Sequence, residues 1–338
     1  MLRGRWRVIR LVVPVLLACA AGCGGGGGAN PQARPAITRA PEPRETRHDR
    51  THLAPSDAED DETSAWRPGR FMTQAVGRVT GAAQRFEQQS RFGFDEDASC
   101  VLGAFLENGR EVSVTRPLRA GVRYVILGGG SDGVEDLDLA VESPEGKSVA
   151  ADTMDDAQPV VELTPKADGK YRIRLGNAKK GEGGGFGVVA IMREGGLSIP
   201  VRRFVESFGR TLSNAAQASH LVARRMKGSQ GLAFHADGEW SFFGTILAEE
   251  ENIRTGGLEL EAPLSVILAG ADGQADDVNL EVLDATTNAI AGSDEADDAA
   301  PVVVIEPTKG HTYKVSVSNV KGRGTSLVTM LVLDLDVP

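Results

Sequence analysis

Two groups of acidic residues are the side chains whose types and spacing could do chemistry in this sequence. Calcium takes about six to eight oxygen ligands, mostly from carboxylates and carbonyls. Aspartates in turns also cap backbone amides and keep strand edges soluble without any metal. The spacing does not match an EF-hand loop, so both interpretations stay open. The candidate calcium ligands are Asp132, Asp136, Asp138, Asp152, Asp155 and Asp156 in the first group, and Asp276, Asp277, Asn279, Asp294, Asp297 and Asp298 in the second.

A nucleophilic serine is the next candidate, because Gly129, Ser131 and Gly133 satisfy the spacing of a nucleophile elbow. An elbow must open a helix, whereas here the chain runs on into a predicted strand, DLDLAV. The glycines from 181 to 187 also lack a following helix and predict a hairpin turn, not a phosphate-binding loop. The histidines after the N-terminal region, none with a recognisable partner motif, are His220, His235 and His311. We therefore predict that the chain is not an enzyme.

The N-terminal cysteines and the residues before them indicate that the protein is located in the cell envelope. The first ten residues carry four arginines, and the run from Leu11 to Gly22 is apolar and small, as in a signal peptide. Ala20-Ala21-Gly22-Cys23 resembles the lipobox of bacterial lipoproteins, which implies diacylglycerol and palmitate on Cys23. Because Ala20 stands where the pattern usually has Leu, Leu16-Leu17-Ala18-Cys19 remains open, with Cys19 as the alternative lipidation site.

The chain that would follow the lipid is expected to be a disordered tether. Residues 23–66 consist mainly of Gly, Pro, Arg, Ala and acidic residues without apolar periodicity, so they cannot bury enough surface to fold. Cys100 would be the only other cysteine of the mature chain. It lies in the alternating segment SCVLGAFL, which predicts a buried, inert thiol rather than a nucleophile.

The remainder of the chain contains two copies of one unit. LGAFL at Leu102 aligns with FGTIL at Phe243, and YVILGGGSDGVEDLDLAV aligns with SVILAGADGQADDVNLEV at the same offset of 141. After one inserted residue the match continues, and it pairs Asn177 with Asn319. A repeat of this length predicts two structural modules of the same fold.

Each copy has the pattern of a β-sandwich. Short apolar or alternating runs are separated by Gly, Asp, Pro or Asn. Leu137, Leu139 and Val141 should face a core while their acidic neighbours face solvent, because side chains alternate along a strand. In the first copy the runs begin near Ser99, Arg110, Gly121, Leu137, Ser148, Val160, Lys170 and Gly185.

An amphipathic helix is predicted before each sandwich, from apolar residues at steps of three and four. The polar faces are basic: residues 66–92 hold five arginines against Glu87, and residues 199–228 hold six Arg or Lys against Glu206. Such helices could lie on an anionic membrane or a nucleic acid. We favour packing of the apolar stripe on the adjacent sandwich, with the basic face set against an acidic module.

The predicted fold is mainly β: two tandem jelly-roll-like β-sandwiches, each preceded by an amphipathic α-helix, after a disordered N-terminal tether. The predicted boundaries are 1–22 for the signal peptide, 23–66 for the tether, 67–196 for the first unit (helix 69–91, sandwich 97–194) and 197–338 for the second (helix 200–227, sandwich 238–336).

The order of motifs in each copy resembles the bacterial pre-peptidase C-terminal domain. An apolar strand is followed by a Gly-rich turn, an Asp-Leu-Asp-Leu strand, a Pro-x-Gly turn from Pro144 to Gly146, an Asp-rich loop and a Gly-x-Tyr strand ending in Asn. The resemblance implies a non-catalytic jelly-roll-like sandwich, and some members bind calcium or insoluble substrates. This chain departs from the family because it has no peptidase domain, and because Asn279 replaces the second Asp of the strand motif.

These features predict a non-catalytic, lipid-anchored envelope protein whose two modules bind or scaffold a protein or a polysaccharide. The alternative is a calcium-stabilised structural module of the envelope, and an enzyme of unknown type is the least favoured. A net charge of −10 argues against nucleic acid as a partner. Gly24 rather than Asp follows Cys23, which favours the outer membrane, on its periplasmic or surface face.

Overall fold

The computed structural model describes residues 68–336, except for residues 180, 182, 227, 228, 230 and 237. The chain divides into two compact units, Met1–Ser56 and Asp57–Pro338, and every described residue belongs to the second. The predicted signal peptide, both candidate lipidation cysteines and the predicted tether lie outside the described residues.

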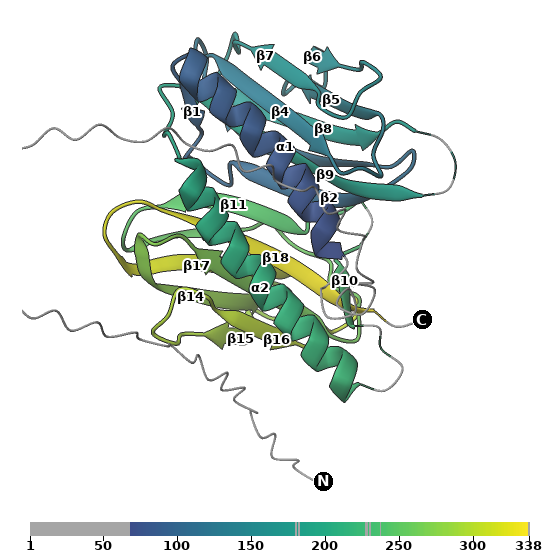
Figure 1. Ribbon diagram of the computed structural model, residues 1–338, viewed down its shortest axis with the longest axis vertical. Coiled ribbons are helices and arrows are strands. Elements are labelled where there is room, and N and C mark those ends of the chain that lie inside the picture. The colour runs from purple at the N-terminus through teal and green to yellow at the C-terminus, as the bar shows by residue number, and fades with distance from the viewer. Residues whose placement is uncertain are drawn as a thin grey trace, which may run out of the picture. The chain divides into compact units, whose positions relative to one another are not determined.

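The first copy is one helix followed by nine strands (Figure 1). Its elements are α1 (Pro68–Gln89), β1 (Phe92–Phe94), β2 (Val101–Glu107), β3 (Glu111–Leu118), β4 (Tyr124–Gly130), β5 (Leu137–Glu142), β6 (Ser148–Asp152), β7 (Val160–Leu163), β8 (Gly169–Asn177) and β9 (Gly184–Glu194). All eight predicted runs form strands, β2 to β9. Strand β1 was not predicted, because a segment of three residues is too short to show a period of two.

The second copy repeats the same order of elements. They are α2 (Val201–Arg225), β10 (Gly231–Phe234), β11 (Phe242–Leu247), β12 (Glu251–Arg254), β13 (Ser265–Ala271), β14 (Ala275–Asp284), β15 (Ala289–Asp294), β16 (Val302–Ile305), β17 (Tyr313–Gly322) and β18 (Ser326–Asp336). Both helices lie within the predicted ranges to about two residues, and α1 begins at Pro68, where the missing N–H costs no helical hydrogen bond. The mainly β fold with a helix before each sandwich is confirmed.

The strands form one large antiparallel sheet and two small ones. The ten-stranded sheet has the order β16-β13-β18-β11-β2-β9-β4-β7, with β1 paired to β9 and β10 paired to β18. The four-stranded sheets have the orders β3-β8-β5-β6 and β12-β17-β14-β15. Each order in the second copy mirrors that in the first, so the two copies share one continuous sheet.

A pseudo-two-fold axis relates the two copies at the centre of the large sheet. Strands β2 and β11 pair antiparallel, with Val101 opposite Gly244, Leu102 opposite Phe243 and Gly103 opposite Phe242. Leu102 and Phe243 are also the residues that the repeat aligns, so equivalent residues face each other across this axis. Outside the sheet, Trp240 of the second copy donates from Nε1 to the carbonyl of Ser113 in the first, at 2.9 Å.

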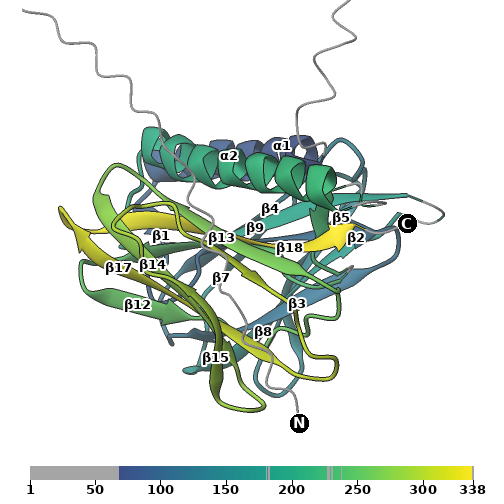
Figure 2. The same cartoon turned by 90° about the horizontal axis from the view of Figure 1, so that it is seen from below.

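The described unit has three layers. Both helices cover one face of the ten-stranded sheet, and the two small sheets cover the other face (Figures 1 and 2). Strand β4 is buried along its length: Tyr124 and Ile126 enter the core between the sheets, while Val125 and Leu127 enter the core under the helices. Burial on both faces explains why this strand is an unbroken apolar run instead of an alternating one.

The packing of both helices on the sandwiches confirms the favoured interpretation of their apolar stripes. Met72, Ala75 and Val79 of α1 are fully buried against the sheet. Helix α1 approaches the sheet most closely at Gly129 of β4, where a Cβ would lie 2.6 Å from Val79. The equivalent Gly270 of β13 meets Thr211 of α2 in the same way, so both helices are seated on a glycine of the equivalent strand.

The expected placement of the basic faces against acidic modules is wrong for most of the arginines. Arg78 of α1 binds Asp132, and Arg203 of α2 binds Asp272, each at the end of a strand beneath its helix. The other arginines of the two helices point away from the sheet, because the apolar stripe occupies the inner face of each helix. The exposed ones are Arg70, Arg85, Arg202, Arg210, Arg224 and Arg225.

Candidate functional site

Comparing the two copies distinguishes residues that the fold requires from residues that only one copy has. Asn177 and Asn319 are both buried, and each donates from Nδ2 to a carbonyl of the equivalent strand, Leu106 and Leu247, at 3.3 Å. A buried amide that makes the same backbone hydrogen bond in both copies is a structural residue. The same comparison can be made for the predicted calcium ligands.

Four of the predicted calcium ligands cap backbone amides in the same way in both copies. Asp152 accepts the amides of Met154 at 3.2 Å and Val160 at 2.8 Å, and the equivalent Asp294 accepts those of Ala296 at 3.1 Å and Val302 at 2.8 Å. Asp156 and Asp298 each accept the amide two residues ahead, at 2.7 and 2.8 Å. These contacts stabilise the turns before β7 and β16.

The other predicted ligands are scattered over the structure. Asp132 lies under α1, where it binds Arg78 and Gln74, and Asp276 lies 3.6 Å from Arg323. Asp155 and Asp297 are exposed on loops, and Asp136, Asp138, Asp277 and Asn279 lie on or beside β5 and β14. Within residues 68–336, as far as they are described, no three His, Cys, Asp or Glu side chains are grouped so that they could hold a metal ion.

Two of these aspartates lie where negative charge is unfavourable. The pKa of Asp138 is raised by desolvation and by the neighbouring carboxylates of Asp136 and Asp152. The pKa of Asp277 is raised by desolvation and by Asp297 and Asp298. The buried Oδ1 atoms of Asp277 and Asn279 have no hydrogen-bond partner among the described residues.

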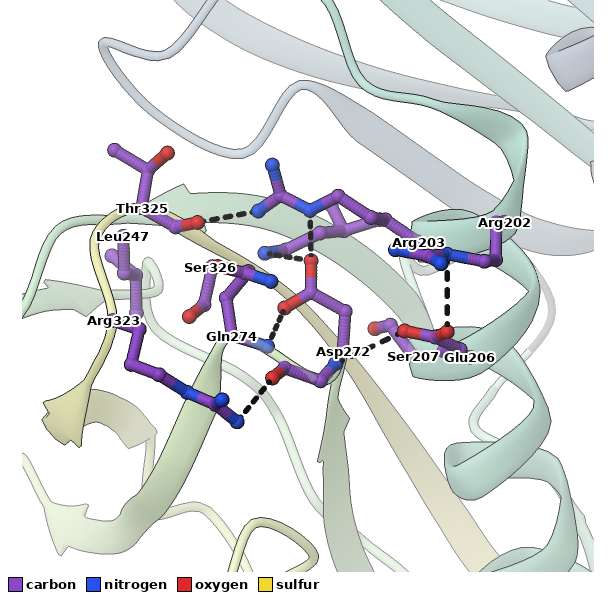
Figure 3. Close-up of polar contacts among 12 residues, drawn as sticks. Arg202, Arg203, Glu206, Ser207, Leu247, Asp272, Gln274, Arg323, Thr325 and Ser326 are labelled. Carbon is purple, nitrogen blue, oxygen red and sulfur yellow. Dashed lines mark hydrogen bonds and ion pairs between the residues drawn. The ribbon is translucent and has the colours of Figure 1, made fainter. Parts of the chain in front are cut away.

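Ser131, the serine of the nucleophile-elbow pattern, has a structural role. Its side chain is fully buried, and its Oγ accepts the amide of Phe186 at 3.0 Å. The equivalent Asp272 accepts the amide of Leu327 at 3.0 Å and the Nε of Arg203 at 2.5 Å. Figure 3 shows Arg203 reaching from α2 to this carboxylate and to the carbonyl of Thr325. Serine and aspartate therefore perform one task, anchoring the start of the last strand of each copy.

Cys100 and two of the histidines are also held inside the fold. Cys100 is buried, as predicted, and burial raises the pKa of its thiol to about 12. His235 is buried, with Nδ1 at 2.7 Å from Asp334, and His311 lies 2.8 Å from Asp284. His220 is exposed on α2.

A cleft in the first copy is the best candidate for a binding site. It has a volume of about 340 Å³ and lies over the sheet β3-β8-β5-β6, on the side away from the core. Glu111 comes from β3, Arg174 and Gly176 from β8, and Asp138 and Ala140 from β5. The remaining lining residues are Gly109, Arg110, Thr153, Asn177 and Ala178.

The register of the strands forms the floor of the cleft. Gly176 pairs with Glu111 on one side and with Asp138 on the other, so two carboxylates stand on either side of a residue without a side chain. In the next row Arg174 pairs with Ala140, whose side chain is only a methyl group. Small residues on the central strands thus create a hollow with charged walls.

Arg174 is held in place across this floor. Its Nη1 donates to Glu142 and its Nη2 to Glu111, both at 2.7 Å, and its Nε is buried without a partner among the described residues. The hydrogen bonds from Arg174 to Glu142 and Glu111 raise the pKa of the guanidinium. The fixed guanidinium, the Asp138 carboxylate and the Thr153 hydroxyl can together exchange several hydrogen bonds with a polar ligand.

The second copy has different side chains in the equivalent region. Ser318 stands at the position of Gly176 and pairs with Asn252 and Asn279, as Gly176 pairs with Glu111 and Asp138. In the next row Glu281 and Ser316 replace Ala140 and Arg174. These replacements place side chains on the floor and remove the guanidinium. The residues that shape the floor of the cleft are therefore specific to the first copy and are not required by the fold.

No protein-family model and no curated protein matches the chain. A periplasmic inhibitor of g-type lysozyme from Aeromonas hydrophila, PliG, is 22% identical over 29% of this chain and 90% of its own, with a TM-score of 0.22. The PBSX exported protein XepA is 12% identical over 70% of this chain and 87% of its own, with a TM-score of 0.23. The tandem CBM22 domain of Paenibacillus barcinonensis Xyn10C is 10% identical over 67% and 85%, with a TM-score of 0.19. At such TM-scores these likenesses carry no argument about function.

The sequence interpretation missed most of this cleft. It named Asp138, but as a calcium ligand, and it named neither Arg174 nor Glu111. Gly176 and Ala140 give no positive signal in a single copy, because their contribution is the absence of a side chain. The available signal was the difference between the copies along β5 and β8, where Ala140 aligns with Glu281 and Arg174 with Ser316.

Proposed function

We propose that the chain is a lipid-anchored, non-catalytic envelope protein that binds a polysaccharide through the cleft of its first copy. The observation that carries the proposal is the hollow at Gly176 and Ala140, flanked by the carboxylates of Glu111 and Asp138 and by the fixed guanidinium of Arg174. Sugar hydroxyls both donate and accept hydrogen bonds, so they suit walls that present acceptors and donors at once. The structural roles of Ser131 and Cys100 support a protein without catalysis.

Filling the cleft tests this proposal. The double variant Ala140→Glu with Gly176→Ser gives the floor of the first copy the residues of the second copy, Glu281 and Ser318. The second copy carries these side chains in a sheet of the same pairing, so the variant should fold. We expect binding of purified bacterial envelope glycans, measured by glycan array and then by calorimetry, to fall by at least about tenfold, because hydrogen bonds between the cleft and the glycan are lost. The matched control is Glu281→Ala with Ser318→Gly in the second copy, which should keep full binding. Equal binding by both variants would exclude the cleft as the glycan site.

The lipid anchor is part of the same proposal and has its own test. The lipobox-like segment ending at Cys23 supports it, as does the basic and then apolar order of the first 22 residues. Cys23→Ser should abolish incorporation of labelled palmitate and release the chain from membranes. If Cys23→Ser is still labelled and Cys19→Ser is not, the anchor is at Cys19. Among the described residues neither helix is long and apolar enough to cross a bilayer.

Calcium stabilisation is a second candidate function. The buried Oδ1 atoms of Asp277 and Asn279 have no partner among the described residues, and desolvation, followed by the carboxylates of Asp297 and Asp298, raises the pKa of Asp277. A hard cation would relieve this repulsion and supply the missing partner. Added calcium should then raise the melting temperature, a chelator should lower it, and Asp277→Asn should remove both responses. An unchanged melting temperature in calcium would exclude this role. The resemblance to the pre-peptidase C-terminal domain stays a proposal beside these two.

A further inference from the structure

The outward surface of α1 and α2, which we call the helix face, is cationic on an acidic chain. It carries the exposed arginines Arg70, Arg85, Arg202, Arg210, Arg224 and Arg225. Figure 2 shows both helices on one side of the large sheet, opposite the two small sheets. The chain as a whole has a net charge of −10, so the helix face is opposite in sign to the molecule that bears it.

The acidic residues of the two helices do not neutralise this face. Glu87 accepts a hydrogen bond from the backbone amide of Ile199, in the segment before α2, at 3.1 Å. Glu206 accepts the amide of Gly273 at 3.1 Å through one oxygen and lies 3.4 Å from Arg202 through the other. Arg202 is thus the only exposed arginine of the described helices with an ion-pair partner among the described residues.

The helix face also exposes large apolar side chains. Phe71 of α1 is 39% exposed and Val205 of α2 is 64% exposed. The apolar stripes of both helices are already used against the sheet, so neither helix can insert lengthwise into a bilayer. A surface with arginines and two apolar side chains is suited to contact with lipid headgroups, with shallow burial of the apolar groups.

The chain connects the proposed anchor to the helical layer. The 45 positions from Cys23 to Pro68 lead directly into the first residue of α1, so the chain enters the described unit in the helical layer. A lipid at Cys23 would therefore bring this layer close to the bilayer at high local concentration.

We propose that the helix face binds the surface of an anionic phospholipid bilayer. The phosphates of the headgroups supply the negative charge that these arginines, Arg202 excepted, do not meet among the described residues. A chain exported by the predicted signal peptide meets phospholipid rather than nucleic acid. Binding in this orientation turns the small sheets, and with them the cleft over β3-β8-β5-β6, away from the membrane and toward its ligand.

Vesicle binding by an unacylated chain tests this proposal separately from the anchor. Residues 24–338, made without the N-terminal segment, are mixed with phosphatidylcholine vesicles that contain or lack phosphatidylglycerol. We expect binding only to the phosphatidylglycerol vesicles, weakened by added sodium chloride. Arg70→Gln, Arg85→Gln, Arg210→Gln and Arg224→Gln together should reduce the partition coefficient at least about 100-fold, at roughly fivefold for each arginine.

A matched variant changes four exposed cations on or beside the small sheets instead: Lys166→Gln, Lys170→Gln, Arg254→Gln and Lys314→Gln. This variant has the same net charge as the first and should bind vesicles far better than it does. Circular dichroism of both variants checks that each is folded. An equal loss of binding in both variants, or binding indifferent to phosphatidylglycerol, would overturn the proposal. Binding to an acidic polymer such as DNA but not to the vesicles would also overturn it.

Discussion

Asp138 stands in the cleft at a cost to stability. Its neighbours Asp136 and Asp152 are both acidic, whereas the second copy has the neutral Asn279 at the equivalent position. A carboxylate in unfavourable surroundings is expected where function, and not stability, decides the residue. Its place beside Gly176 and opposite Glu111 is consistent with such a role.

The difference in stability between the Asp138→Asn variant and the parent should depend on pH in a defined direction. The pKa of Asp138 is raised in the folded chain above its ordinary value of 3.8, first by desolvation and then by Asp136 and Asp152. Folding therefore disfavours the charged carboxylate, and the stability present below pH 3.8 declines as the pH rises through the folded pKa. The variant should melt higher than the parent at neutral pH, and the two should converge below pH 3.8.

The reverse change in the second copy is the matched comparison. Asn279→Asp adds a carboxylate near those of Asp277, Asp297 and Asp298. The variant should melt lower than the parent at neutral pH, and the two melting temperatures should converge at acid pH. Melting curves by circular dichroism across the acid range measure both variants. If Asp138→Asn is the less stable protein at neutral pH, the carboxylate is stabilising and this interpretation is wrong.

The two copies place an acidic residue and a basic residue on opposite strands at one buried position. In the first copy Asp95 at the end of β1 lies 3.2 Å from the Nε of Arg193 on β9. In the second copy His235 after β10 lies 2.7 Å from Asp334 on β18. Strands β1 and β10 pair with β9 and β18 in the same register, so the acidic and basic partners have exchanged strands.

A charge exchange should show that these pairs are interchangeable. His235→Asp alone places two carboxylates together in a buried site and should cost about 3–5 kcal/mol of unfolding free energy. Adding Asp334→Arg recreates the residue types of the first copy and should recover about 1–3 kcal/mol through coupling. Urea unfolding of the parent, both single variants and the double variant gives the cycle. A double variant no more stable than His235→Asp would show that the two positions are not equivalent.

At the scale of elements, the seat of each helix on a glycine makes a prediction. Gly129→Ala places a Cβ 2.6 Å from Val79 and 3.2 Å from the carbonyl of Ala75, so α1 must move outward. We expect a loss of about 1–3 kcal/mol, as for other overpacked interfaces. Gly77→Ala on the exposed face of α1 meets nothing within 4 Å and should stabilise by about 0.4–1 kcal/mol. Thermal melts measure both, and equal effects of the two changes would contradict the close approach.

The elements were predictable where periodicity is strong. Leu137, Leu139 and Val141 alternate with half-exposed neighbours, as the period of two requires, and β5 was predicted from them. The helices followed from apolar steps of three and four. Strand β1 was not predicted because three residues are too few to show a period of two, and β10 lies before residue 238, where the predicted sandwich of the second copy begins. The cleft was not predictable from one copy, because its floor is made by side chains that Gly176 and Ala140 do not have.

At the scale of the molecule, the joined sheet was beyond the sequence interpretation. The repeat predicted two modules but not that β2 of one would pair with β11 of the other. The apolar runs LGAFL and FGTIL indicate strands buried on both faces. A strand covered only by its own module would show the same pattern, so the runs do not reveal the pairing between the copies. Pairing between edges depends on backbone groups that every residue shares, so it leaves no residue pattern to find.

The first copy alone should therefore form a dimer. A chain of residues 57–196 exposes the edge of β2, with unpaired backbone groups beside Leu102. Two such chains can pair β2 with β2 about a true two-fold axis, in the register that the full chain uses for β2 and β11. Size-exclusion chromatography with light scattering should report a dimer, whereas the full described unit needs no partner at this edge. A stable monomer would show that the pairing is incidental to the fold.

The pseudo-two-fold axis through Leu102 and Phe243 also suggests how the cleft arose. In a homodimer one gene specifies both subunits, so a residue that opens a cleft in one opens it in the other. Joining the two subunits in a single chain removes that constraint, because each half then mutates independently. The open floor with Gly176 and Arg174 in one half and the filled floor with Ser318 and Glu281 in the other are the kind of asymmetry that such a fusion permits. A duplicated chain can thus keep one half as the support and use the other as the receptor.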